Sequence, residues 1–298
     1  MKIIKPVDYL ESMLISTTAV NADANYSSAT TYALGAKATY NSKIYESLQS
    51  SNINHQPDTS PTWWLDLGAD NKHAMFDSQT STSTTASNSL TVVIAPGTPI
   101  DTVALINVEA DLIKITVRNG ISGPIVYEST AGLSGANVQD WYQYFFFDPL
   151  LKRTQVIFYN IPLYASAYIT LEFTKISGTV SIAQASYGNL SSIGGTQYGA
   201  TAGIIDYSRK ETDEFGTTTF IERAFSKRLN AQIYVHNSQL NRVQSYLYSI
   251  RAKPVVWVAS DDPTYEEALV VYGFYKDFST EIAYPTHVMC SLEIEGLT

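Results

Sequence analysis

Charged residues are scarce in this sequence. Asp, Glu, Lys and Arg make up 16% of its 298 residues, whereas about 25% is usual for a soluble domain. The formal net charge is −9, and Lys and Arg form no cluster anywhere along the chain. Because a field that gathers nucleic acid needs such a cluster, we expect no recognition of nucleic-acid sequence.

Residues that could bind a metal are also few. The single cysteine, Cys290, lies in an apolar run, which favours a small buried side chain over a reactive thiol. His287 stands three residues before it in an expected strand, so the two would point to opposite faces. The histidines are far apart in sequence, and neither an HExxH nor a CxxC pair is present: His55, His73, His236 and His287. We therefore predict no metal site and no cofactor.

The patterns of a membrane span and of common active sites are missing as well. No run of about 18 apolar residues occurs, so the sequence predicts no membrane-spanning helix. It contains no GxSxG turn, no signature of a Cys–His nucleophile and no phosphate-binding loop. These absences exclude the best-known routes to nucleophilic catalysis and to nucleotide binding.

Carboxylate pairs are the remaining route to hydrolysis, above all of glycans, where two acids must face the bond across a cleft. Glu293 and Glu295 share one face of an expected strand, where a contact between subunits is favoured. The other pairs are neighbours in sequence: Asp213 and Glu214, Asp261 and Asp262, Glu266 and Glu267. Adjacent carboxylates cannot by themselves face one another across a cleft, so we predict that the protein is not an enzyme.

Short alternating runs separated by turn residues dominate what the sequence does contain, and they predict a mainly β fold. Over residues 69–199 they predict a β-sandwich, with the Ser/Thr-rich tract 78–89 as a long loop or edge inside it. The strands expected there cover residues 90–94, 102–107, 113–117, 142–147, 154–159 and 168–173. A Gly- and Ser-rich stretch at 187–199 then predicts a domain boundary near residue 200.

Residues 200–298 combine strand patterns with one helical period. A helical face is indicated by apolar residues that recur at steps of three and four: Leu240, Val243, Tyr246, Leu247 and Ile250. Asn237 or Ser238 can cap the start of this helix, and Pro254 prevents its continuation. With strands expected at 218–222, 231–235, 255–259, 269–274 and 288–294, this part reads as an α+β module that ends in a long hairpin.

The first 68 residues divide into an arm and a small β module. Residues 1–30 have no pattern long enough to bury themselves, which fits either an arm that holds neighbouring subunits or a poorly ordered terminus. Residues 31–68 are rich in rings: Tyr32, Tyr40, Tyr45, Trp63 and Trp64. Such rings stack on sugars, form the centre of subunit contacts, or fill a core. We name Tyr45, Trp63 and Trp64 as candidate carbohydrate-binding residues, with the loop 57–64 as the better outward contact.

The motifs of this small module resemble a known family. Three of its motifs are similar to those of the carbohydrate-binding modules of chitinases: YALGAKATY at 32–40, KIYES at 43–47, and the final Pro57…Pro61-x-Trp63. In that family an acidic residue usually follows the glycine, whereas Ala36 stands here. The resemblance implies binding of a host-surface glycan.

A second resemblance covers most of the remaining chain. Similar modules in phage tail proteins precede a stretch like NKHAMFD at 71–77 and a sandwich that resembles the galactose-binding, discoidin-like jelly roll. The segments 220–223, 254–257, 272–274 and 292–297 resemble phage tail-tip or distal-tail proteins, whose strand-helix-hairpin units of the tail-tube type pack into rings. This resemblance implies a structural virion protein of the tail tip or baseplate, with copies of itself and neighbouring tail proteins as partners. The alternative is a carbohydrate-binding adhesin or receptor-binding module without a role in a ring.

Overall fold

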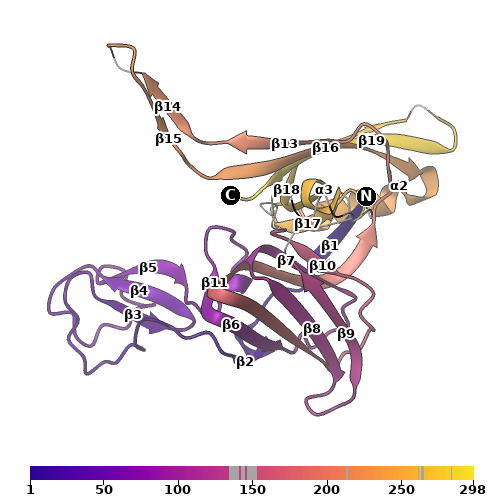
Figure 1. Ribbon diagram of the computed structural model, residues 1–298. Coiled ribbons are helices and arrows are strands. Elements are labelled where there is room, and N and C mark those ends of the chain that lie inside the picture. The colour runs from indigo at the N-terminus through magenta and orange to yellow at the C-terminus, as the bar shows by residue number, and fades with distance from the viewer. Residues whose placement is uncertain are drawn as a thin grey trace. The chain divides into compact units, whose positions relative to one another are not determined.

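The computed structural model describes residues 1–133, 141, 145, 153–212, 214–260, 262, 265–282 and 284–298. Strands hold 53% of the residues and helices 9%, in large antiparallel sheets, which confirms the mainly β prediction (Figure 1). The chain forms two compact units. Unit 1 comprises Met1–Val7 and Ser186–Thr298, and unit 2 comprises Asp8–Ala185.

Unit 2 is built around a five-strand antiparallel ladder in the order β2, β6, β11, β8, β9. A further antiparallel pair, β7 with β10, completes the sandwich. The bounds are β2 Leu14–Thr17, β6 Thr84–Ile94, β7 Thr102–Glu109, β8 Leu112–Asn119, β9 Ile125–Gly132, β10 Val156–Phe158 and β11 Ala167–Ser192. The strand expected at 142–147 lies outside the described residues, apart from Phe145.

The core of the sandwich follows from the alternation of these strands. In register, Leu171 of β11 lies between Val92 of β6 and Ile115 of β8, and all three side chains are fully buried. The rows on either side are equally apolar, Ile94 with Ile169 and Val117, and Leu90 with Phe173 and Ile113. Because every second side chain points inward, this apolar alternation sets the register of the three strands.

The small module of unit 2 is a three-stranded antiparallel sheet of β3 Lys37–Tyr40, β4 Lys43–Ser47 and β5 Trp64–Ala69. Asn41 and Ser42 form the two-residue turn between β3 and β4, with φ of 48° and 62°. A tight hairpin turn with positive φ at both positions matches the twist of its strands, and Asn tolerates that conformation well. Two short 3-10 helices flank the module, Glu11–Met13 before it and Ala74–Phe76 after it.

Unit 1 is an antiparallel sheet with the helix α2, Leu240–Ser249, packed against it. Its strands run in the order β11, β1, β17, β18, β19, β16, and β12 and β13 also pair with β16. The bounds are β1 Lys2–Pro6, β12 Gly195–Thr196, β13 Thr201–Asp206, β14 Arg209–Thr212, β15 Thr218–Ile221, β16 Phe225–His236, β17 Val255–Val258, β18 Val270–Glu281 and β19 His287–Gly296. Val243, Leu247 and Ile250 of the expected helical face lie in the core with Trp257. The short helices are a 3-10 turn at Asn237–Gln239 and α3 at Glu266–Leu269.

The N-terminal residues correct the expectation of an arm at 1–30. Ile3 and Ile4 of β1 are fully buried, because β1 pairs with β11 on one side and with β17 on the other. The Met1 amine donates a hydrogen bond to the carbonyl oxygen of Gly194 at 2.6 Å. Strand β1 has only five residues, so its pattern alone does not predict a strand. Its place in the sheet depends on partner strands that are distant in sequence.

The division between the units falls between Ala185 and Ser186, before the boundary expected near residue 200. Strand β11 runs without a break into the Gly- and Ser-rich stretch as far as Ser192, since its end pairs with β1. Gly188 is needed there because a Cβ would lie 2.0 Å from the carbonyl oxygen of Lys5. The small module, expected as a domain of its own at 31–68, belongs to the same compact unit as the sandwich.

Candidate functional site

Two of the three rings named as sugar contacts are buried. Tyr45 is 6% exposed and Trp64 is 2% exposed, and both belong to the core of the small module. The Trp64 indole packs edge-on against Tyr32 with the ring centroids 4.9 Å apart, and its Nε1 donates to the carbonyl oxygen of His55 at 2.8 Å. A ring enclosed in this way cannot stack on a sugar, so the assignment of Tyr45 and Trp64 to carbohydrate binding has to be corrected.

Trp63 is the partly exposed member of the predicted set. Its ring stacks on His55 with the centroids 3.9 Å apart and the planes 10° from parallel. His55 is held by Asn52, whose buried side-chain oxygen lies 3.0 Å from the imidazole Nδ1. One face of the indole is therefore occupied by a fixed neighbour, which leaves the other face as its possible contact surface.

A pocket of about 360 Å³ lies beside the same core, and two rings that were not predicted as contacts line it. Tyr26 and Tyr40 are half-buried and meet edge to face at 5.7 Å. Asn25, Asn41 and Lys72 add polar groups to the lining. Aromatic surface with amide and amino groups around it suits a polar ligand that also has an apolar face, as sugars have.

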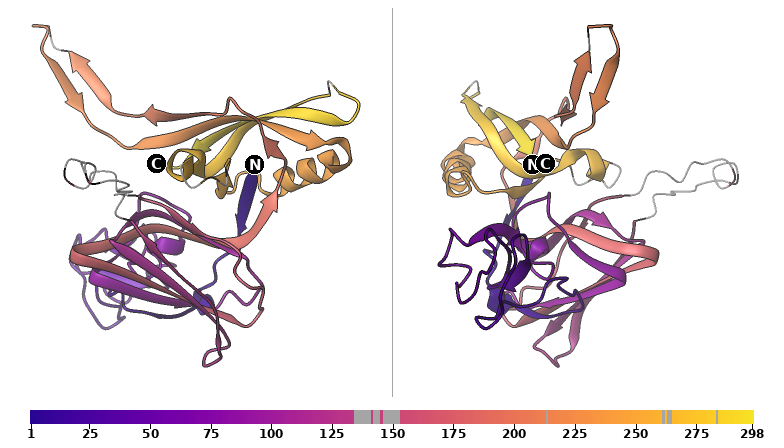
Figure 2. Two further views of the ribbon diagram at one scale, coloured as in Figure 1. Left: turned by 45° about the vertical axis from the view of Figure 1, so that its right-hand side comes forward. Right: turned by 90° about the vertical axis from the view of Figure 1, so that its left-hand side faces the viewer.

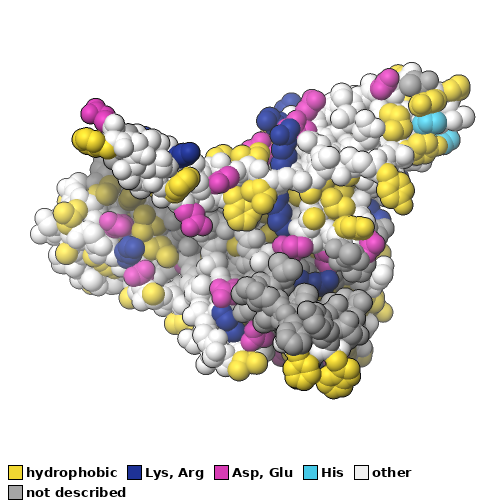
Figure 3. Space-filling view, turned by 45° about the horizontal axis from the view of Figure 1, so that its top comes forward, with side chains coloured by type: hydrophobic (Ala, Val, Ile, Leu, Met, Phe, Trp, Pro, Cys, Tyr) yellow, Lys and Arg dark blue, Asp and Glu magenta, His cyan; other side chains and the backbone are white. Residues whose placement is uncertain are grey.

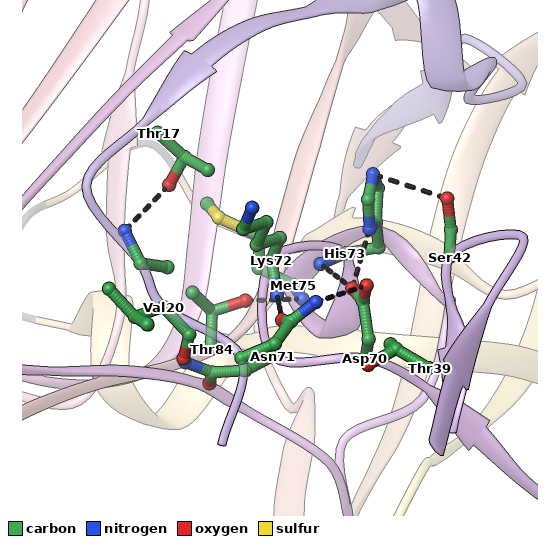
Figure 4. Close-up of polar contacts among 12 residues, drawn as sticks. Thr17, Val20, Thr39, Ser42, Asp70, Asn71, Lys72, His73, Met75 and Thr84 are labelled. Atoms are coloured by element: carbon green, nitrogen blue, oxygen red, sulfur yellow. Dashed lines mark hydrogen bonds and ion pairs between the residues drawn. The ribbon is translucent and has the colours of Figure 1, made fainter. Parts of the chain in front are cut away.

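A buried carboxylate, that of Asp70, belongs to the lining of this pocket, and Figure 4 shows its polar contacts. Asp70 is 3% exposed and accepts hydrogen bonds from Asn21 Nδ2 at 2.8 Å, from the backbone N–H of His73 at 3.1 Å and from His73 Nδ1 at 2.5 Å. Burial raises the pKa of Asp70, but the hydrogen bonds from His73 and Asn21 outweigh this effect and hold the pKa below its usual value of 3.8. The carboxylate thus stays ionised at neutral pH.

Ser42 extends this pair into the order Asp–His–Ser. Its Oγ lies 3.4 Å from His73 Nε2, outside the roughly 2.6–3.2 Å at which a base takes a hydroxyl proton. The carbonyl oxygen of Ser42 also accepts the backbone N–H of Asp70 at 3.0 Å. We interpret Asp70, His73 and Ser42 as a structural cluster, which we call the clamp. It holds the β3–β4 turn against the segment after β5.

Asn71 continues the clamp toward the sandwich (Figure 4). Its Nδ2 donates to the carbonyl oxygens of Val20 and Thr85 at 2.8 and 2.9 Å, while its Oδ1 accepts the Thr85 N–H at 2.8 Å. One side-chain amide therefore serves as a strand-like link between β6 and the segment before the small module. Lys72 adds a link to the same segment, because its N–H donates to Asn21 Oδ1 at 3.3 Å.

Asp70→Asn should lower the stability of unit 2 most strongly near neutral pH. The substitution keeps the size of the side chain but removes the charge that accepts three hydrogen bonds, at a cost of about 1–3 kcal/mol. Because the folded-state pKa is depressed, the wild-type advantage is present above the unfolded-state pKa and is lost as pH falls through the folded-state pKa. Thermal unfolding of both proteins between pH 7 and about 2 measures the difference.

The matched control for this experiment is Asp66→Asn. Asp66 is an exposed carboxylate that bonds Lys43 at 2.6 Å on the surface of the same sheet. Exposed ion pairs contribute little, about 0–1 kcal/mol. Equal losses for the two variants at pH 7, or a loss for Asp70→Asn that does not shrink in acid, would contradict the structural role of the Asp70 charge.

Three of the carboxylates weighed as catalytic candidates have a side-chain partner, and two lie outside the described residues. Glu293 bonds Arg228 at 2.9 Å, and Glu295 accepts the hydroxyl of Tyr207 at 3.2 Å. Glu267 bonds Lys227 at 3.1 Å. Asp213 and Asp261 are not among the described residues. Nowhere in the described part of the chain do three His, Cys, Asp or Glu side chains gather as metal ligands would.

Two of the histidines lie opposite each other on neighbouring strands of unit 1. His236 of β16 and His287 of β19 are opposite each other in register. The His287 ring lies 4.4 Å from that of Tyr284 and 4.5 Å from that of Tyr234, and Figure 3 shows histidine and apolar side chains together at this end of unit 1. The strand pairing explains why residues far apart in sequence lie together here.

The second candidate surface is a hairpin, residues 201–225, that we call the arm. It begins as β13 paired with β16 and continues as the separate pair β14 and β15 (Figures 1 and 2). Every residue of β14 and β15 is exposed. Large apolar side chains stand on it nonetheless, Ile204 at 70%, Phe215 at 94% and Phe220 at 72% exposed. Because large exposed apolar patches mark interaction sites, we treat the arm as a candidate contact surface.

Comparison with known proteins adds no further assignment. No protein-family model matches the chain, and no curated protein matches it either. Across the described residues, no helix is long and apolar enough to cross a membrane. The function is therefore argued from the pocket and the arm.

Proposed function

We propose that this chain is a structural protein of a phage tail tip or baseplate, located in the virion, where copies of it assemble into a ring. The observation that carries the proposal is the arm. A two-stranded ribbon is marginal in water by itself, and one that exposes large apolar side chains gains stability once a neighbour covers it. Neighbouring tail or baseplate proteins are further partners under this proposal.

The finer architecture belongs to the same proposal. The sandwich of unit 2 is a jelly roll like that of galactose-binding modules, and the C-terminal part of unit 1 is an α+β module of the tail-tube type. What supports the second assignment is the succession of β16, α2, β17 and the long hairpin of β18 and β19. Strand β19 is paired on both sides, with β18 and with β16, whereas β17 pairs with β18 only as far as Gly273. The second half of β18, residues 274–281, is therefore the strand edge that suits a ring contact.

Mass spectrometry and cryo-electron microscopy of intact phage particles test this function directly. We expect the chain among the virion proteins, in several copies arranged around the tail axis. Native mass spectrometry of the isolated protein supplies a second measurement, with a closed oligomer as the expected species. A chain that is absent from particles and stays monomeric at its highest soluble concentration would refute the proposal.

A second function, glycan binding, is favoured by the pocket beside Tyr26 and Tyr40. The rings offer apolar surface and Asn25, Asn41 and Lys72 offer hydrogen bonds, so the ligand we propose is a host-surface glycan. This function fits a tail protein and equally an adhesin without a ring. A closed oligomer would favour the tail protein, whereas glycan binding by a monomer would favour the adhesin.

Tyr40→Ala should reduce glycan binding at least tenfold on a glycan array, because each aromatic stacking partner contributes about 1–3 kcal/mol to a bound ring. Trp63→Ala separates the corrected site from the predicted one, since Trp63 is not part of the pocket lining. Circular dichroism of both variants checks that the small module remains folded. Binding that is lost with Trp63→Ala and kept with Tyr40→Ala would place the glycan at the indole instead.

A further inference from the structure

The charges around the pocket of about 360 Å³ in unit 2 select the kind of glycan that it suits. Besides the tyrosines, four titratable side chains belong to its lining: Glu11, Asp70, Lys72 and His73. Asp70 and His73 are bonded to each other within the clamp. A charge that already has a partner inside the protein gains little from a ligand, so the selection depends on Glu11 and Lys72.

The Lys72 amino group is open to a ligand. Its backbone N–H is bonded to Asn21, but within the described residues its Nζ has neither a hydrogen bond nor an ion pair. In Figure 4 dashed lines reach the ring of His73, and none reaches the Lys72 amino group. Other lysines of unit 2 are paired, as Lys43 and Lys175 are, each with a carboxylate at 2.6 Å. All three donors of the Lys72 ammonium group thus remain for a bound molecule.

Of the two remaining charges, that of Lys72 is the less screened. Lys72 is half-buried, whereas Glu11 is exposed, on the short helix Glu11–Met13. Water and salt screen an exposed charge, so an ion pair made there contributes little. A half-buried charge is screened less. The pocket should therefore favour an anion, and Glu11 should weaken this preference without reversing it.

The neutral groups of the lining match the rest of a sugar. Tyr26 and Tyr40 supply ring surface for its apolar face. In the described part of the chain the Asn25 side chain makes no hydrogen bond, so its amide is available both to donate and to accept. Asn41 Nδ2 is bonded to Asp58 at 3.3 Å, and its oxygen remains as an acceptor. Sugar hydroxyls need both kinds of partner.

We propose that the glycan bound in this pocket is acidic, with a carboxylate or phosphate of the sugar paired with Lys72. This inference rests on the proposed glycan binding and names the class of its ligand. An ammonium group forms a strong, charge-assisted hydrogen bond with either anion. It acts as a point charge without the planar fork of arginine, so carboxylates and phosphates share the chemistry that it recognises.

A glycan array of matched pairs tests the charge with the full-length protein. Each uronic-acid oligosaccharide stands beside its carboxyl-reduced form, and each phosphorylated oligosaccharide beside its dephosphorylated form. Because the two members of a pair differ only in the acidic group, the ratio of their dissociation constants measures the preference. We expect the acidic member of at least one kind of pair to bind about tenfold or more tightly. The kind of pair that shows this preference tells carboxylate from phosphate.

Lys72→Gln should bring that ratio to within about threefold, because glutamine keeps a polar side chain but removes the charge. The fold should survive, since the Lys72 side chain has no partner to lose and its backbone bond to Asn21 remains. Glu11→Gln should raise the ratio, because it removes the opposing charge. The matched control is Lys37→Gln, an exposed lysine of β3 outside the pocket lining, which should leave the ratio as it is.

Two results would overturn the acidic ligand and leave glycan binding in place. The first is equal binding of acidic and neutral members by the wild-type protein, with the binding still reduced by Tyr40→Ala. The second is an acidic preference that Lys72→Gln does not change. A wild-type protein that binds no glycan on the array would overturn the glycan function itself, and the class of ligand with it.

Discussion

Replacing Trp257 with alanine should lower the melting temperature of unit 1 by about 10 °C or more. Trp257 of β17 is fully buried, and its Nε1 donates to the carbonyl oxygen of Gly273 at 3.0 Å. Truncation of a buried tryptophan costs about 3–5 kcal/mol, through lost burial and through the cavity that remains. The variant also leaves the Gly273 carbonyl without its indole donor, which adds to the cost.

Differential scanning calorimetry measures this effect, and the two compact units help to locate it. We expect the transition of unit 1 to shift and that of unit 2 to stay. Trp141→Ala is the matched control, because Trp141 is 78% exposed and its truncation should change stability by no more than about 0.5 kcal/mol. Equal shifts for the two variants would show that Trp257 is not the packing centre of unit 1.

Trp257→Phe separates packing from hydrogen bonding at the same position. Phenylalanine keeps most of the apolar volume and loses the Nε1–H donor to Gly273. The expected loss is about 1–3 kcal/mol, the cost of one buried unpaired acceptor plus a small cavity. A loss as large as that of Trp257→Ala would assign the stabilisation to the hydrogen bond instead of the ring.

Local periodicity was enough to predict the elements whose own residues carry their pattern. The apolar steps from Leu240 to Ile250 predicted the helix found at Leu240–Ser249. The strand at 90–94 was also predicted, although the Ser/Thr tract before it proved to be part of the same strand from Thr84 onward. Thr and Ser fit an extended backbone as well as a loop, so their composition alone could not decide between the two.

The features that could not be predicted depend on strand pairings between segments that are distant in sequence. The five residues of β1 look like an unstructured terminus until β11 and β17 are placed on either side of them. The same holds for the pair His236 and His287, which only the pairing of β16 with β19 brings together. Neither segment contains a signal for the strand that it will meet.

In the candidate site, too, the sequence could not predict which side chains are buried and which are exposed. Trp63 and Trp64 are adjacent, and neighbouring side chains at the start of a strand point in opposite directions, so one of them faces the core. The sequence does not say which, and the structure buries Trp64. Tyr26 was missed because it falls in residues 1–30, the N-terminal segment that was not expected to pack against the small module. The closeness of Asp70 and His73 in sequence was the one signal that could have indicated the clamp.

Removal of the outer part of the arm, residues 207–224, should leave unit 1 folded and abolish its assembly. Residues 207–224 can be replaced by Asn-Gly, because Asp206 and Phe225 are directly opposite in register and a two-residue turn joins such a pair. The deletion takes no residue from the core cluster of unit 1, whose buried members on either side of the arm are Ile193 and Leu229. We therefore expect little change in melting temperature, and monomers in place of oligomers by native mass spectrometry.

The comparison that sharpens this experiment is Phe220→Ser in the full-length arm. It removes one apolar side chain from the proposed contact and keeps the ribbon, so assembly should weaken but not vanish, with a dissociation constant raised about tenfold or more. A shortened protein that still forms closed oligomers would show that the ring is held by the sheet edges of unit 1. In that case the exposed side chains of the arm would be available for a different tail protein, and only the copy-to-copy contact through the arm would have to be abandoned.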